Sequence, residues 1–101
     1  MKNERPLVEA LTTFVKENPT SLHVPGHKNG VLSNLPSVIK EALKYDVTEL
    51  SGLDDFHHPE EAIKEAEILL AQTYGADASF FLVNGTTVGN LAMIYAHYAV
   101  Q

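Results

Sequence analysis

The sequence predicts an α/β protein, because an apolar strand, a glycine-centred turn and a helix follow one another near its end. The strand is predicted at Ser79–Val83, a short apolar run that stops at the turn residues Asn84 and Gly85. The following helix, Val88–Val100, is apolar on most of its circumference, which indicates burial on more than one side. Ser21–Val24 shows a weaker strand pattern. Since a parallel sheet needs strands that repeat with crossover helices, we expect most of the sheet to lie outside these residues.

Two amphipathic helices are predicted in the first half of the chain. The first begins at Pro6, which suits a first helical turn, and continues to about Glu17. Its apolar stripe fits either a core face or an arm that packs on a partner subunit, and the pattern favours neither. The stripe consists of Leu7, Ala10, Leu11, Phe14 and Val15. The second helix is predicted over Pro36–Leu43, with one apolar and one charged side.

A third helix is predicted between Pro59 and Gly75. Glu60 and Glu61 follow the proline and suit the positive end of the helix dipole, and Gly75 is a stop signal. The predicted buried stripe consists of Ile63, Ala66, Leu69, Leu70 and Tyr74. On the last helix, His97 lies among apolar residues and is predicted to be packed in the core rather than catalytic.

The turn before the last helix has the features of an anion site. Gly85 can adopt dihedral angles that are closed to other residues, so that Thr86 and Thr87 begin a helix whose first amides carry partial positive charge. Their hydroxyls add donors, and together these groups predict a phosphate cradle, although neither GxxxxGK[ST] nor GxGxxG is present. Local spacing alone favours the alternative, a buried strand followed by a helix that one of the threonines caps.

The loop around His23 and His27 invites a metal interpretation, because two histidines four residues apart form a metal pair on a helix. Pro25 and Gly26 exclude that helix and favour a tight turn. Gly26 is then expected at positive φ, with His27 and Lys28 at the exposed end of the turn. The alternative to a functional loop is an ordinary solvent-facing one.

A second polar loop contains Asp54, Asp55, His57 and His58. These four carboxylate and imidazole side chains lie within five consecutive positions and resemble a metal cluster, but few such clusters in a sequence prove to be metal sites. We therefore predict no metal site.

Composition excludes only a few classes of function. The 101 residues carry a net charge of −6 at pH 7, which argues against nucleic-acid binding, because a basic patch is expected there. The chain has neither a run of about 18 apolar residues nor a charged-then-apolar leader, so we expect a cytoplasmic protein without a membrane segment. The absence of cysteine excludes disulfides and thiolate metal sites.

Three segments occur in an order and at a spacing that point to one family: HVPGHKNG (His23–Gly30), DVTELSGLDDFHHP (Asp46–Pro59) and FFLVNGTTVGNLAMI (Phe80–Ile94). Nearly all of the chain from Pro6 onward resembles the Orn/Lys/Arg decarboxylases with the aspartate aminotransferase fold, and among them the shorter Gram-positive type. One departure is Glu61, because relatives typically read HHPEG where this chain has a second glutamate.

The resemblance implies a fold type I large domain that depends on pyridoxal 5'-phosphate, entered through a helical N-terminal segment and then its first strand and helix. It implies that Gly85, Thr86 and Thr87 bind the cofactor phosphate. It further implies two loops at the active-site entrance, where a carboxylate meets the cationic tail of the substrate; whether that carboxylate is Asp54 or Asp55 is left open. The entrance residues are His27, Lys28, Asp54, Asp55 and His57.

Length limits what these residues can do alone. The family needs several times 101 residues, so residues 1–101 are expected to be the N-terminal part of the major domain, without its remainder or the C-terminal domain. In the family, the Schiff-base lysine, the aspartate that pairs with the pyridine nitrogen and the aromatic ring partner all lie downstream of the phosphate turn. Lys64 is the last lysine here. We therefore expect no catalytic residue and no activity in this segment by itself.

For the full-length enzyme, the resemblance implies decarboxylation of arginine, lysine or ornithine to a di- or polyamine precursor by a homodimer or higher homo-oligomer. An aminotransferase or aldolase-like lyase of the same fold is an alternative, although HVPGHK and GLDDFHHP count against it. A non-catalytic remnant or accessory segment that associates with a homologue is an alternative of another class.

Overall fold

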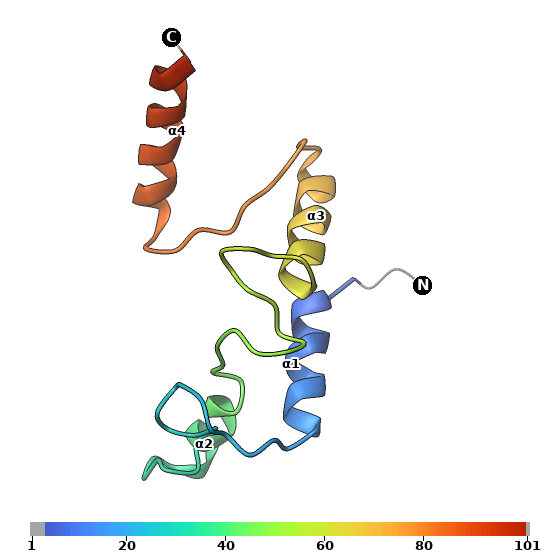
Figure 1. Ribbon diagram of the computed structural model, residues 1–101, viewed down its shortest axis with the longest axis vertical. Helices are drawn as coiled ribbons and strands as arrows, with labels where there is room; N and C mark the ends of the chain where they lie inside the picture. The colour runs from blue at the N-terminus through green and yellow to red at the C-terminus, as the bar shows by residue number, and fades with distance from the viewer. Residues whose placement is uncertain (1–3, 101) are drawn as a thin grey trace.

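The computed structural model describes residues 4–100, and over these residues it contains four helices. They are α1 (Pro6–Lys16), α2 (Ser37–Leu43), α3 (Ala62–Tyr74) and α4 (Thr86–Val100). Figure 1 shows α3 above α1, α2 beside the lower end of α1, and α4 standing apart at the end of a long connection. Among these four helices, α1 and α3 are the pair in contact.

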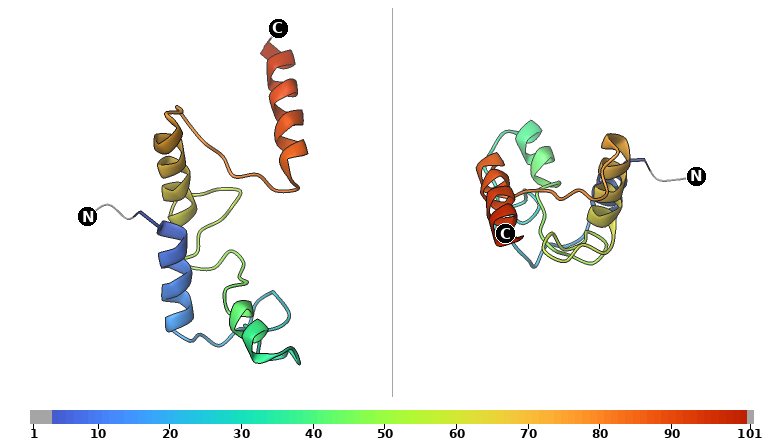
Figure 2. Two further views of the ribbon diagram at one scale, coloured as in Figure 1. Left: turned by 180° about the vertical axis from the view of Figure 1, so that it is seen from behind. Right: turned by 90° about the horizontal axis from the view of Figure 1, so that it is seen from above.

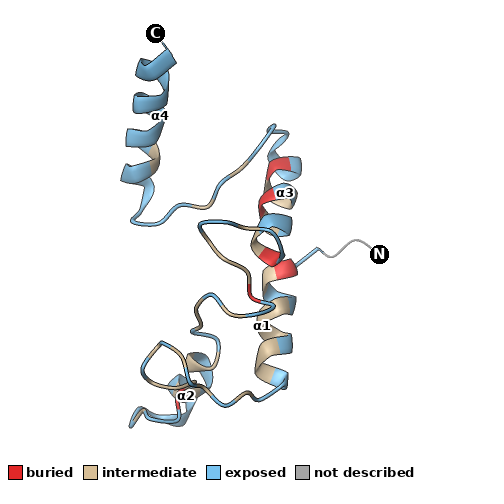
Figure 3. Ribbon diagram, viewed as in Figure 1, coloured by how far each residue is buried: buried red, intermediate tan, exposed pale blue. Residues whose placement is uncertain are grey.

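A small core lies where α1, α3 and the loop that precedes α3 meet. Its buried residues include Pro6 of α1, Leu53 of the loop, and Ala62 and Ala71 of α3 (Figure 3). The predicted first helix is confirmed to within a residue, and all five residues of its apolar stripe are half-buried. Because α1 packs on α3 of the same chain, its stripe serves as a core face here.

The third helix begins later than predicted, and four of the five residues of its predicted stripe, Ile63, Ala66, Leu69 and Leu70, are half-buried. It starts at Ala62 rather than at Pro59, and Gly75 ends it in the left-handed region with φ 66°. Tyr74, predicted to be buried, is 81% exposed, whereas Glu67 is buried. The predicted stripe is only partly buried because, among the four described helices, α1 alone contacts α3, and it covers one side of that helix.

The two predicted strands are not confirmed in the described part of the chain. Ser79–Val83 and Ser21–Val24 run as irregular segments, and residues 4–100 contain no strand. A strand exists through hydrogen bonds to a neighbouring strand, and the described residues offer neither segment such a partner. One side-chain contact ties the first of these segments to α3, because the Ser79 hydroxyl donates to the carbonyl oxygen of Glu67. The α/β class thus rests on the sequence pattern, and the described residues are helical.

Helix α4 forms where the sequence predicts a helix, but its residues are exposed except at Gly89, which is half-buried (Figure 3). Leu91, Ile94 and Tyr98 are 62%, 68% and 78% exposed. The prediction that His97 is packed in a core is wrong for these residues, because His97 is exposed as well. None of the helices over residues 4–100 has the length and hydropathy to cross a membrane.

Candidate functional site

The predicted phosphate turn has the backbone that its glycine suggested. Asn84 and Gly85 have φ 64° and φ 81°, and α4 begins directly after them at Thr86. A Cβ on Gly85 would meet no atom within 4 Å, so the glycine is required for its conformation rather than for space. Thr86 and Thr87 lie in the first turn of α4, where backbone N–H groups have no partner within the helix, and both residues are exposed.

The side chain of Leu82, just before this turn, approaches α4 closely at Gly89. A Cβ built on Gly89 would lie 2.6 Å from Cδ1 of Leu82, so the absence of a side chain at Gly89 lets Leu82 fold back against the helix. The segment before the turn therefore packs against α4 through Leu82.

In the loop that contains His27, both ring nitrogens are used by the protein itself. The Gly30 N–H donates to His27 Nδ1 at 3.0 Å, and His27 Nε2 lies 2.9 Å from Oδ2 of Asp46. An N–H donor at Nδ1 requires a bare nitrogen there, so the proton sits on Nε2 and is donated to the carboxylate. The predicted role of Gly26 is wrong, because the residues at positive φ are Lys28 (52°), Asn29 (55°) and Gly30 (87°).

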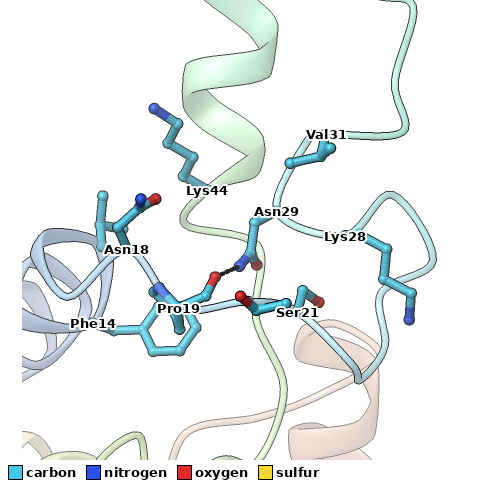
Figure 4. Close-up of a pocket in the computed structure, with 10 residues that line it drawn as sticks. Phe14, Asn18, Pro19, Ser21, Lys28, Asn29, Val31 and Lys44 are labelled. Atoms are coloured by element: carbon cyan, nitrogen blue, oxygen red, sulfur yellow. Dashed lines mark hydrogen bonds between the residues drawn. The ribbon is translucent and has the colours of Figure 1, made fainter.

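Lys28 lines a hollow of about 330 Å³ at the lower end of α1 (Figure 4). Its ammonium donates to the carbonyl oxygen of His23 at 2.6 Å, and in Figure 4 its side chain points away from Asn29. The Asn29 amide donates to the carbonyl oxygen of Pro19 at 3.4 Å. Lys28 and His27 therefore stabilise their own loop in this conformation.

Asp54 is the most heavily bonded side chain of the second loop. Its Oδ1 accepts the backbone N–H of Asp55 at 2.8 Å and of Glu60 at 3.0 Å. Its Oδ2 accepts those of Glu61 and Ile63, both at 2.9 Å, and of Lys64 at 3.3 Å. The amides of Glu61, Ile63 and Lys64 lie at the N-terminus of α3. Asp54 therefore caps this helix as an N-cap side chain would, although it lies seven residues before Glu61 in the sequence.

The electrostatics of Asp54 follow from these contacts. Desolvation raises the pKa of its carboxyl, but hydrogen bonds from the N–H groups of Glu60, Asp55, Glu61 and Lys64 outweigh it and lower the pKa from 3.8 to about 2. Asp54 is therefore ionised throughout the neutral range.

The neighbouring residues of this loop are less engaged. Asp55 Oδ1 accepts the N–H of His57 at 2.9 Å, and the exposed His57 ring meets Phe56 edge to face at 5.3 Å. His58 pairs with Glu60 at 3.2 Å. Within residues 4–100 no group of three or more carboxylate, imidazole or thiol side chains is arranged to bind a metal ion.

The predicted site residues fall into three places. Asp54, Asp55 and His57 belong to the segment that leads into α3, whereas His27 and Lys28 belong to the segment between α1 and α2, which lies lower along the long axis beside α2 (Figures 1 and 2). The turn at Gly85–Thr87 lies at the base of α4, apart from the loop near α2. Over residues 4–100, therefore, the structure does not gather the phosphate turn and both loops into one pocket.

Comparison with known proteins covers almost the whole chain. Residues 5–100 match the family profile described as "Orn/Lys/Arg decarboxylase, major domain". A protein of Bacillus subtilis (strain 168) named "Uncharacterized protein YaaO" is 56% identical over 91 residues, which are 88% of this chain and 19% of that protein.

Two further relatives have names that state an activity. An "Arginine decarboxylase" of Bacillus cereus is 40% identical over 96 residues, 90% of this chain and 20% of the relative. A "Constitutive lysine decarboxylase" of Escherichia coli (strain K12) is 33% identical over 97 residues, which are 84% of this chain and 13% of that protein. The chain thus spans a fifth or less of the length of these relatives. No solved structure matches it.

Proposed function

We propose that this chain, which belongs to the Orn/Lys/Arg decarboxylase family, supplies the N-terminal part of a pyridoxal-phosphate-dependent enzyme that decarboxylates arginine, lysine or ornithine. The family match and the relatives named arginine and lysine decarboxylase support this assignment. Because the chain spans so small a share of these relatives, residues 1–101 contribute to cofactor binding and to the approach to the site, and the bond-breaking residues come from elsewhere in the enzyme.

The observation that carries the proposal is the turn from Asn84 to Thr87. Two successive residues at positive φ come directly before the first amides of α4, and the two residues that follow, Thr86 and Thr87, are exposed and carry hydroxyls. A helix N-terminus with free amides favours a phosphate dianion through hydrogen bonds and the helix dipole. The open space around Gly85 is compatible with the close approach of such a group.

The chemistry divides between this chain and its cofactor. Pyridoxal phosphate, when bound, supplies the electron sink that accepts the carbanion electrons as carbon dioxide leaves. Thr86 and Thr87 would hold the phosphate, and Gly85 would allow their amides to reach it. This grip would fix the cofactor at one end and thereby orient its reactive end toward residues from the rest of the enzyme.

The two polar loops are proposed to line the approach for the substrate. A basic amino acid carries a cationic tail, and the loop with Asp54 and Asp55 provides carboxylates, while the loop with His27 and Lys28 provides the opposite wall. His57 is exposed and belongs to the first of these loops. In the complete enzyme we expect further elements to bring these loops and the phosphate turn around one site.

The test replaces Thr86 and Thr87 with valine in the complete enzyme that carries this sequence. Valine keeps the shape and removes both hydroxyls, each of which contributes about 1.5 to 3 kcal/mol if it donates to a buried ionised phosphate. We expect cofactor affinity to fall roughly ten-fold or more, with activity recovered by excess pyridoxal phosphate, because the backbone donors remain.

Several variants control this experiment. Double replacement with serine keeps the hydroxyls and should retain affinity. Thr12→Val with Thr73→Val removes two helical hydroxyls that donate within their own helices, at 2.7 and 2.8 Å, and should leave cofactor binding unchanged. Gly85→Val should do more damage than the threonine pair, because it denies the turn its backbone conformation. Unchanged cofactor affinity in the double valine variant would make the threonines structural caps and the assignment of the phosphate site wrong.

The exposed apolar surface of α4 favours a second candidate, an accessory segment that associates with a full-length homologue through that surface. A reading frame downstream that encodes an SxHK-like lysine segment would support the decarboxylase over this alternative.

A further inference from the structure

We infer that Asp54 is a positioning residue of the proposed decarboxylase and not the carboxylate that contacts the substrate's cationic tail. Its side chain fastens the loop of residues 54–61 to the N-terminus of α3 and so sets where Asp55 and His57 lie. The inference rests on the proposed function for its substrate, but its structural half depends only on contacts within this chain.

The Asp54 carboxylate is already saturated with hydrogen bonds from the backbone. A carboxylate offers about four lone-pair sites. Asp54 already accepts five backbone N–H groups, two at Oδ1 and three at Oδ2, within 2.8 to 3.3 Å. A substrate ammonium or guanidinium would have to displace amides that open α3. By contrast, a single backbone N–H, that of His57, donates to Asp55 at Oδ1.

The backbone conformation of Asp54 is also unusual. Its φ of 69° lies in the left-handed region, where a non-glycine residue is uncommon and carries a cost. Such a conformation persists where surrounding contacts over-determine it, and here the bonds to α3 do so. A residue kept only for its turn conformation would be at least as well served by glycine, whereas a residue kept for its carboxylate would not.

Asp54 lies where α1, α3 and the loop before α3 meet. Asp54 lines a hollow of about 320 Å³ together with Leu7 of α1, Leu53 and Phe56 of the loop, and Ile63 of α3. The carboxylate therefore lies at the junction of the elements that form the core. Loss of its bonds would let the loop move relative to α3, and Asp55 and His57 would move with it.

The experiment uses the complete enzyme loaded with pyridoxal phosphate, with the variants Asp54→Asn and Asp54→Gly and the matched control Asp55→Asn one position away. Hydrogen exchange is followed at the amides of residues 60–64. We expect exchange there to become roughly ten-fold faster or more in both Asp54 variants, since losing about 1.4 kcal/mol of protection corresponds to a factor of ten. Exchange at these amides should stay near the parent rate in Asp55→Asn.

A kinetic comparison separates positioning from contact. The ratio of kcat/KM for the basic amino acid that the parent enzyme prefers to that for its uncharged analogue reports recognition of the cationic tail; for arginine that analogue is citrulline, and for lysine it is norleucine. We expect this ratio to change less than about three-fold in Asp54→Asn, while kcat and cofactor affinity fall together. A collapse of the ratio by ten-fold or more with unchanged exchange at residues 60–64 would overturn the inference and make Asp54 a substrate contact.

The design also separates this inference from the proposed function. If the parent enzyme decarboxylates no basic amino acid, the proposed function fails, and the exchange measurements alone then decide the role of Asp54. If Asp54→Asn does not fold, Asp54→Gly, which relieves the positive φ, provides the same comparison. Parent-like exchange in both variants would contradict the positioning role whatever the activity.

Discussion

The ionisation of Asp54 gives the start of α3 a dependence on pH. Its pKa is lowered to about 2 in the folded chain from an ordinary value of 3.8. A depressed pKa contributes stability that is fully present above the unfolded value, so the contribution is complete above about pH 4 and is lost as pH falls through 2. We therefore expect the amide resonances of Ile63 and Lys64 to shift with a midpoint near pH 2, not near 3.8.

The same titration in Asp54→Asn provides the comparison, because asparagine does not ionise. Its amide resonances at residues 63 and 64 should show no transition of this kind. A midpoint near 3.8 in the parent would mean that the carboxylate does not hold these amides in solution.

At the residue scale, the sequence predicts candidate side chains from their chemistry, whereas the contacts of those side chains depend on the fold. Chemistry predicts His27, Lys28 and Asp54 as site residues. In the structure Lys28 bonds within its own loop, and Asp54 bonds to the start of α3. His27 accepts from Gly30 in its own loop and pairs with Asp46, which follows α2. Aspartate before a helix start is a known capping signal, but Asp54 lies ten residues before Lys64, beyond the reach of a local capping pattern. Only the folded loop brings that carboxylate to those amides. By contrast, Gly85 could be predicted, because its requirement is local.

At the element scale, α4 is expected to drive association of residues 1–101. Its apolar side chains have no described partner over residues 4–100, and a surface of this kind is covered in stable proteins. Ile94→Glu with Tyr98→Glu should reduce association in analytical ultracentrifugation. Asn90→Glu, which adds the same kind of charge to an exposed polar position of α4, should not. A monodisperse parent with a cooperative thermal transition would contradict this expectation.

The helices could be predicted from the sequence because their signals are local: periodicity, a proline at the start, a glycine at the end. α1 and α4 match their predicted ranges closely, and Gly75 ends α3 as expected. The strands could not, because a strand is defined by its neighbour. Ser79–Val83 has a strand's composition, and residues 4–100 provide no strand beside it. The burial of α4 fails for the same reason.

At the scale of the whole molecule, the fold is open. The radius of gyration is 16.9 Å, against about 13 Å for a compact domain of this length. The accessible surface is 7970 Å², whereas a compact protein of this mass exposes about 5,700 Å². The excess, roughly 2,300 Å², is as large as the total area buried in a sizeable protein–protein interface. Residues 1–101 thus have surface for a large partner, whether that is more of the same enzyme or a second copy.

Residues 1–101 by themselves are expected to be inactive. No lysine follows Lys64, so none lies beyond the phosphate turn, where the family has its Schiff-base lysine. The purified 101-residue polypeptide, mixed with pyridoxal phosphate and treated with borohydride, should yield no adduct at a single defined lysine, and it should release no carbon dioxide from arginine, lysine or ornithine. A defined adduct together with decarboxylation would show that the expectation is wrong.

The cap that Asp54 forms has a consequence for which changes this region can accept. Its carboxylate accepts only backbone N–H groups, so the cap itself places no demand on the side chains at residues 60 and 61, whereas it does fix the number of residues between Asp54 and α3. Glu61 stands where the family pattern has glycine, and its backbone N–H donates to Asp54 Oδ2 at 2.9 Å. Substitutions at residues 60 and 61 should therefore be tolerated by the fold far better than the insertion or deletion of one residue between Asp55 and Pro59, which would shift the amides of residues 60–64 out of register with the carboxylate.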